Sequence, residues 1–119
     1  MADSTTTVAA LKDAMRRFVA ERSWESFHCP KNLSMDAAVE AAELLEHFLW
    51  MDNDASRQVA NDAAKREAIA DEIADVACYL LAMSNSLGID LSEAIRAKLA
   101  KNELKYPAEK YRGKYRLEE

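Results

Sequence analysis

The sequence predicts an all-α protein with four helices. Only two glycines and two prolines occur among the 119 residues, whereas 22 residues are alanine. Strand-rich folds need more turn residues than this, and alanine is the strongest helix former. Apolar side chains also recur every three or four residues, which is the spacing of one helix face. At this length we expect a single domain over residues 1–119 with one hydrophobic core.

The first helix is expected over residues 5–21, with Ser4 or a neighbouring threonine as its N-cap. Its apolar stripe consists of Val8, Leu11, Met15 and Phe18. A loop follows that brings Trp24, Phe27 and His28 close together in the sequence.

The second helix is expected over residues 33–50, after a cap at Asn32 or Ser34. Residues 51–62, MDNDASRQVAND, are polar and rich in acids. They predict a loop with one frayed turn at most.

The third and fourth helices have clear end signals. The third is expected over residues 62–87, where Gly88 supplies the C-terminal stop. The fourth opens with Asp90 and Glu93 in the spacing of a capping box, and Pro107 ends it. We expect the charged tail that follows either to be loose or to dock on a partner subunit.

Composition narrows the class of protein. The net charge of −5 argues against a protein that coats a nucleic-acid polymer. The longest apolar run, residues 76–83, is too short to span a bilayer, so no membrane is expected as a partner. Cys29 and Cys78 lack metal-type spacing and indicate reduced thiols. The N-terminus lacks the architecture of a signal peptide, so we expect a cytoplasmic location.

Two pairs of carboxylates are the most informative feature of the chain. Glu40 and Glu43 form one pair and Glu72 and Asp75 the other, and the i, i+3 spacing places each pair on one helix face. Residues 68–83 contain no lysine or arginine. Ionised carboxylates in so apolar a helix need a counter-charge, and a divalent metal ion is the natural one.

The two pairs carry different weight. Glu40 and Glu43 alone fit the solvated face of an amphipathic helix. Glu72 and Asp75 do not, because their neighbours are apolar. Two such helices packed antiparallel could bring four carboxylates together. Such a site suits Mg²⁺ or Mn²⁺ and, through the metal, phosphate groups.

The predicted fourth helix has a basic face that carries Lys98, Lys101, Asn102 and Lys105. This face is either simply solvated or stabilises the charge of a polyphosphate beside the metal. In the second case Asn102 acts as a neutral hydrogen-bond donor and Lys98 as the main cation.

Three aromatic residues are placed to stack on a base, namely Trp24, Trp50 and Tyr79. Buried aromatic residues more often belong to a core. Trp50 lies ten residues after Glu40, on roughly the same face of the predicted helix, and Tyr79 lies one turn after Asp75. This arrangement fits a site that holds phosphates near the acids and a base beyond them. His28 is a candidate for substrate binding or for a structural hydrogen bond.

These residues resemble the signature of the all-α nucleoside triphosphate pyrophosphohydrolases, the MazG-like superfamily, and most closely its dCTP pyrophosphatase branch. The signature is ExxE followed by ExxD, here Glu40 to Glu43 and Glu72 to Asp75, with 28 residues between. The surrounding segments FVAERSWESFHCPKNL, DEIADVACYLLAM and KLAKNELKYPAEKYRGKY make the resemblance more specific. It covers about residues 11–116.

The resemblance implies a four-helix MazG-like bundle, assembled as a homodimer or a dimer of dimers with sites between subunits. It implies Mg²⁺ coordination by the four carboxylates, and substrate contacts from Trp24, Trp50, Tyr79, Lys98 and Asn102. The implied reaction is hydrolysis of (deoxy)nucleoside triphosphates, above all dCTP, to the monophosphate and pyrophosphate.

The chain departs from the family pattern at Met15 and Glu103, where relatives often carry other side chains. These two departures leave the nucleotide preference open. The alternatives are a hydrolase of the same fold that acts on dUTP or a phosphoribosyl-nucleotide, and a non-enzymatic helical interaction module whose acids are surface charge.

Overall fold

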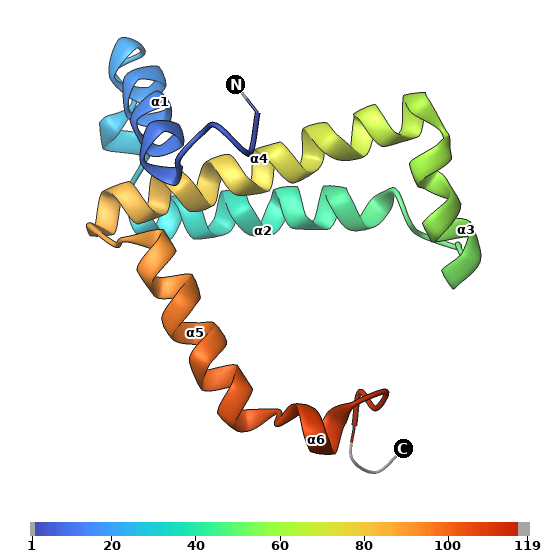
Figure 1. Ribbon diagram of the computed structural model, residues 1–119. Helices are drawn as coiled ribbons and strands as arrows, with labels where there is room; N and C mark the ends of the chain where they lie inside the picture. The colour runs from blue at the N-terminus through green and yellow to red at the C-terminus, as the bar shows by residue number, and fades with distance from the viewer. Residues whose placement is uncertain (1, 117–119) are drawn as a thin grey trace. The chain divides into compact units, whose positions relative to one another are not determined.

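The computed structural model describes residues 2–116, and within them the chain forms helices and no strand, as Figure 1 shows. The helices are α1 (Val8–Glu21), α2 (Pro30–Glu46), α3 (Asn53–Gln58), α4 (Ala63–Leu87), α5 (Leu91–Lys105) and α6 (Ala108–Tyr111). Short 3-10 turns occur at Glu25–Phe27 and Val59–Asn61. The prediction of an all-α protein is confirmed. None of the helices in this part of the chain is both long and apolar enough to cross a membrane.

The chain divides after Gly88 into two compact units. In the first unit α2 and α4 lie side by side and run antiparallel, and α1 packs against the C-terminal half of α4 (Figure 1). The core of this unit is small and consists of Val19, Leu33, Val59, Leu81 and Ala82. Leu33, in the first turns of α2, has no exposed surface at all.

Side-chain caps explain where three of the helices begin. Thr7 accepts a hydrogen bond from the Ala10 N–H group and caps α1, which begins at Val8, three residues after the predicted start. Asp62 caps α4, and Asp90 caps α5 by accepting from the Glu93 N–H group, as predicted. Gly88 adopts a left-handed conformation, with φ of 63°, that ends α4.

The predicted start of α2 is wrong by three residues. The helix begins at Pro30, because proline fits the first turn, where its missing N–H group needs no partner. Cys29 is the N-cap, so the predicted caps Asn32 and Ser34 lie inside the helix. The Asn32 side chain instead donates to the carbonyl oxygen of Phe27.

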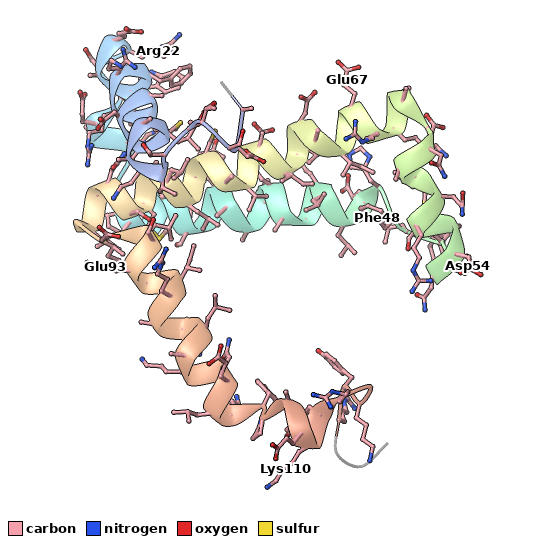
Figure 2. All side chains as sticks on the ribbon, in the orientation of Figure 1. Arg22, Phe48, Asp54, Glu67, Glu93 and Lys110 are labelled. Carbon is pink, nitrogen blue, oxygen red and sulfur yellow. The ribbon has the colours of Figure 1, made fainter. Side chains whose placement is uncertain are left out.

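The predicted end of α2 is also wrong, because the helix stops at Glu46 and not at Trp50. After it the chain tightens into i→i+3 hydrogen bonds, including Phe48 N–H to the Leu45 carbonyl (Phe48 is labelled in Figure 2). Trp50 then takes a left-handed conformation, with φ of 66°, that a helix cannot include.

The segment predicted as a loop after α2 contains a helix. Asp52 accepts a hydrogen bond from the Ala55 N–H group at 2.7 Å and caps α3. Asp54, labelled in Figure 2, pairs with Arg57 at 3.2 Å across one turn. Local capping and charge pairing therefore order a segment whose polarity suggested a loop.

The second unit contains α5 and α6. Pro107 separates these helices, and the rings of Tyr106 and Tyr111 meet edge to face with centroids 5.2 Å apart. The first part of the predicted tail is therefore ordered, whereas its last residues, 117–119, lie outside the described residues. The expectation of a single domain over residues 1–119 stays a prediction.

Candidate metal centre

Three of the four predicted metal ligands meet between α2 and α4. Glu40 and Glu43 of α2 and Glu72 of α4 each place one carboxylate oxygen so that all three oxygens lie within 4.8 Å of one another. The i, i+3 spacing on α2 and the antiparallel packing on α4 produce this arrangement. Like charges this close repel one another unless a proton or a cation lies between them.

No ion pair within residues 2–116 neutralises these carboxylates. The Oε2 atoms of Glu40 and Glu72 are shielded from solvent and have no hydrogen-bond partner. The ion pairs seen within residues 2–116 involve other acids, namely Asp13, Glu21 and Asp54. Converging carboxylate oxygens are the ligands that hard divalent cations prefer, so these residues fit a metal ion such as Mg²⁺.

The crowding of the acids changes the acidity of Glu40. Its pKa rises from 4.5 to about 7, chiefly because the protonated form can donate a hydrogen bond to Glu43. Loss of hydration and the charge of Glu43 come next, followed by a hydrogen bond with Glu72 and the charge of Asp75. Near neutral pH, therefore, a proton on Glu40 supplies the positive charge that a bound cation would otherwise supply at this position.

Asp75, the fourth predicted ligand, lies one turn after Glu72 and is solvent-exposed. It is not among the three acids whose oxygens converge, yet its charge raises the pKa of Glu40 and of Cys78. The pKa of the half-buried Tyr79 is raised by burial and then by Asp36, Glu40 and Asp75. Tyr79 is therefore close to the acids, as its spacing predicted.

Asp36 was not among the predicted ligands, although it lies one turn before Glu40 on α2. Its i, i+4 spacing to Glu40 is visible in the sequence. It extends the acidic surface toward the start of α2.

The first unit also has a pocket of about 380 Å³, between α1 and the C-terminal end of α4. Its lining residues are Met15, Arg16, Val19, Ala20, Glu25, His28, Ala82, Asn85 and Ser86. Of the predicted site residues only His28 lines it. Its Nδ1 atom is shielded from solvent and has no hydrogen-bond partner. Asn85 was missed, because no motif distinguishes it within the sequence of α4.

The predicted aromatic residues have different surroundings. Trp24 stacks on His28, with ring centroids 6.5 Å apart and planes at 28°, and so stands next to the pocket residues. Trp50 is fully exposed and lies beyond the end of α2, so the inference that it shares a helix face with Glu40 and Glu43 is wrong. Its substrate contact stays a prediction.

Lys98 and Asn102 belong to α5, in the second unit. Lys98 is exposed and Asn102 is half-buried. Their contact with a polyphosphate stays a prediction.

Comparisons with known proteins agree with these features. A model of the MazG-like family matches residues 36–115. The chain is 33% identical to dCTP pyrophosphatase 1 of Bos taurus over 110 residues, which are 92% of this chain and 65% of the relative. It is 34% identical to dCTP pyrophosphatase 1 of Mus musculus over 107 residues, which are 90% of this chain and 63% of the relative. The chain therefore spans just under two thirds of the length of these relatives.

A solved structure has the same fold. The crystal structure of a pyrophosphatase from Archaeoglobus fulgidus superimposes with a TM-score of 0.77 at 34% sequence identity. The match covers 90% of this chain and 98% of that protein. The family model covers both carboxylate pairs and most of the chain, and the fold and the sequence relatives agree with it, so the chain belongs to the MazG-like family.

Proposed function

We propose that this chain hydrolyses a deoxynucleoside triphosphate, in the first place dCTP, to the monophosphate and pyrophosphate, with Mg²⁺ as cofactor and Mn²⁺ as an alternative metal. The observation that carries the proposal is the convergence of Glu40, Glu43 and Glu72, two of which have a shielded oxygen without a partner. The similarity to dCTP pyrophosphatase 1 of two mammals supports the choice of substrate.

Glu40, Glu43 and Glu72 would hold the cation, and Asp75 would complete the acidic set from one turn further along α4. The cation supplies positive charge that offsets the triphosphate oxygens and the charge that develops in the transition state. In the reaction a water molecule attacks phosphorus, the bond between the α- and β-phosphates breaks, and pyrophosphate leaves.

Three further tasks fall to side chains. Glu40 or Glu43 accepts the proton of the attacking water, because a carboxylate oxygen that does not bind the cation is free to do so. Lys98 and Asn102 bind the departing pyrophosphate. Trp24, Trp50 and Tyr79 contact the nucleoside, and His28 does so from the wall of the pocket beside Trp24.

The pocket between α1 and α4 is the place for the base. Tyr79 and Ala82 follow Asp75 at four and seven residues, so they continue the helix face of Asp75 toward the pocket. Seven residues of helix correspond to about 10 Å. An extended nucleotide can therefore place its phosphates at the acids and its base among the apolar side chains of Met15, Val19 and Ala82.

A nucleotide panel tests the proposal directly. The purified protein with Mg²⁺ is mixed with the common deoxynucleoside and nucleoside triphosphates and with a phosphoribosyl-nucleotide, and the released pyrophosphate is measured. We expect dCTP to give the highest kcat/KM. A preference for dUTP or for the phosphoribosyl-nucleotide would identify the corresponding hydrolase, and no turnover of any of them would favour a non-enzymatic interaction module.

The raised pKa of Glu40 predicts how pH acts on the metal-free protein. Folded Glu40 holds its proton up to about pH 7, whereas in the unfolded chain it loses it near 4.5. The folded state therefore binds more protons between these values, and its stability without metal falls as the pH rises from 4.5 to 7. Mg²⁺ must displace that proton, so its stabilising effect grows over the same range.

The measurement is the melting temperature with EDTA and with Mg²⁺ between pH 5 and 8. The Glu40→Gln variant serves as the control, because an amide does not titrate, and its melting temperature with EDTA should vary less across this range. Equal pH dependence of wild type and variant would contradict the assignment of this proton to Glu40.

We also propose that the protein assembles as a homodimer or a dimer of dimers. Ile73, Leu80 and Leu87 recur every seven residues along α4 and are 54%, 46% and 51% exposed. On α2, Met35 and Val39 are exposed by more than half. Apolar surface of this extent, next to so small a core, is typical of an interface.

The cytoplasmic location expected from the sequence stays a prediction.

A further inference from the structure

Asn85 connects two helices that form the pocket. Its side-chain Nδ2 donates a hydrogen bond of 2.9 Å to the main-chain carbonyl oxygen of Lys12, 73 residues away on α1. A carbonyl oxygen can only accept, so the atom that faces it must be the amide nitrogen. The orientation of the amide is therefore fixed, and its oxygen points elsewhere.

That oxygen has nothing to bind within the described chain. Asn85 Oδ1 is shielded from solvent and has no hydrogen-bond partner. An acceptor removed from water without a partner is unfavourable, and native proteins rarely keep one without a reason. His28 Nδ1 is also shielded from solvent and has no hydrogen-bond partner, and both residues line the same pocket.

The other lining residues limit what can fill the space. Met15, Val19, Ala20 and Ala82 offer apolar surface, Glu25 adds a second acceptor, and the Arg16 guanidinium is already paired with Asp13 at 2.6 Å. A volume of about 380 Å³ lies at the lower end of the range for small-molecule sites. A flat ring with a hydrogen-bond donor on its edge matches this lining.

We propose that Asn85 determines the base specificity of the enzyme, because its Oδ1 accepts a hydrogen bond from the exocyclic amino group of the base. The inference rests on the proposed function and goes beyond it by naming the residue that selects the base. Cytosine carries an amino group at the position where uracil and thymine carry a carbonyl oxygen. A carbonyl there would face the acceptor Asn85 Oδ1 and be repelled.

The test removes the two partners separately and together. Wild type and Asn85→Ala are each assayed with dCTP and with the 2-pyrimidinone deoxynucleoside triphosphate, which is dCTP without the amino group. In wild type, loss of the amino group should lower kcat/KM about tenfold or more, because it leaves the site's acceptor unpaired. In Asn85→Ala the two nucleotides should be used equally well.

Ser84→Ala is the matched control. Ser84 is the neighbouring residue on α4, and its hydroxyl donates to the Leu80 carbonyl at 2.9 Å. The variant therefore also removes a partly buried hydrogen bond, yet it should keep the full preference for the amino group. If Asn85→Ala lowers kcat/KM for both nucleotides by the same factor, the role of Asn85 is purely structural and the inference is overturned.

The outcomes separate this inference from the proposed function. Wild type that hydrolyses no nucleotide refutes the function, whereas active wild type with an unchanged preference in Asn85→Ala refutes only the role of Asn85. If Asn85→Ala does not fold, NMR of the wild type replaces it. The Asn85 side-chain amide signals should shift with dCMP and not with its 2-pyrimidinone counterpart, and equal shifts with both would overturn the inference.

Discussion

Replacing Glu72 by glutamine is expected to lower Mg²⁺-dependent hydrolysis of the preferred nucleotide by about a hundredfold or more. The loss of a single group that stabilises transition-state charge has effects of that order. Glu72 is the only one of the three converging acids that comes from α4, so the other two, both on α2, cannot replace its position. Glutamine keeps the shape of the side chain and removes its charge.

The same substitution has an opposite effect on the metal-free protein. Three acids with oxygens within 4.8 Å of one another repel each other, so removal of one charge relieves the repulsion. We expect Glu72→Gln to melt at the same or a higher temperature than wild type with EDTA. Since a ligand stabilises only the fold that binds it, Mg²⁺ should raise the melting temperature of wild type and not of the variant.

Asp71→Asn is the matched control for Glu72→Gln. Asp71 is the preceding residue on α4, is exposed, and is not among the converging acids. Its loss changes the net charge by the same amount and should leave both the activity and the response to Mg²⁺ intact. Equal responses of the two variants would mean that the acids act only through net charge, as the interaction-module alternative requires.

The metal centre could be predicted from the sequence because its geometry is mostly local. The i, i+3 spacing fixes each carboxylate pair on one helix face whatever the rest of the fold does. The apolar neighbours of Glu72 identify the face of α4 that packs on α2. The structure adds what spacing alone does not contain, namely that Glu40, Glu43 and Glu72 converge and that Asp75 is not among the converging acids.

The surroundings of Trp50 could not be predicted in this way. The apolar pattern continues through Phe48 to Trp50, but α2 ends at Glu46. The next helix, α3, begins after its cap at Asp52. A helix end is decided by the conformation of a few residues, here the left-handed one at Trp50, which hydrophobic periodicity does not report.

The pocket was missed for a different reason. Its walls come from α1 and from the end of α4, and the hydrogen bond between them joins residues 73 positions apart. Nothing in the local sequence of Asn85 indicates that its amide reaches Lys12. Such a site depends on tertiary packing, and only His28 was chosen from sequence, because it lies among aromatic residues.

Replacing Leu80 by glutamate is expected to convert the proposed oligomer into monomers. Leu80 lies in the middle of the stripe formed by Ile73, Leu80 and Leu87, so a second copy that covers this stripe must bury it. An ionised carboxylate buried without a partner is strongly unfavourable. In a two-fold symmetric interface the substitution occurs twice, and we expect self-association to weaken by about a hundredfold or more.

The fold of each subunit should survive this change. Leu80 is 46% exposed within the chain, so glutamate there can keep its charge in water, and the helix content by circular dichroism should match wild type. Light scattering coupled to size exclusion gives the mass of each species over a range of concentrations. Ala74→Glu, at another exposed position of α4 about 100° to 140° around the helix from the stripe, adds the same charge and should keep the wild-type mass.

Activity measured on the same samples connects the assembly to the site. The first unit has a small core and its converging acids are only half-buried, so we expect a neighbouring copy to cover a bound nucleotide. The Leu80→Glu monomer should therefore bind nucleotide more weakly and raise KM, while Mg²⁺ still stabilises it, since all three converging acids come from one chain. A wild type that is monomeric and fully active at every concentration would contradict the proposed assembly and leave the metal centre unaffected.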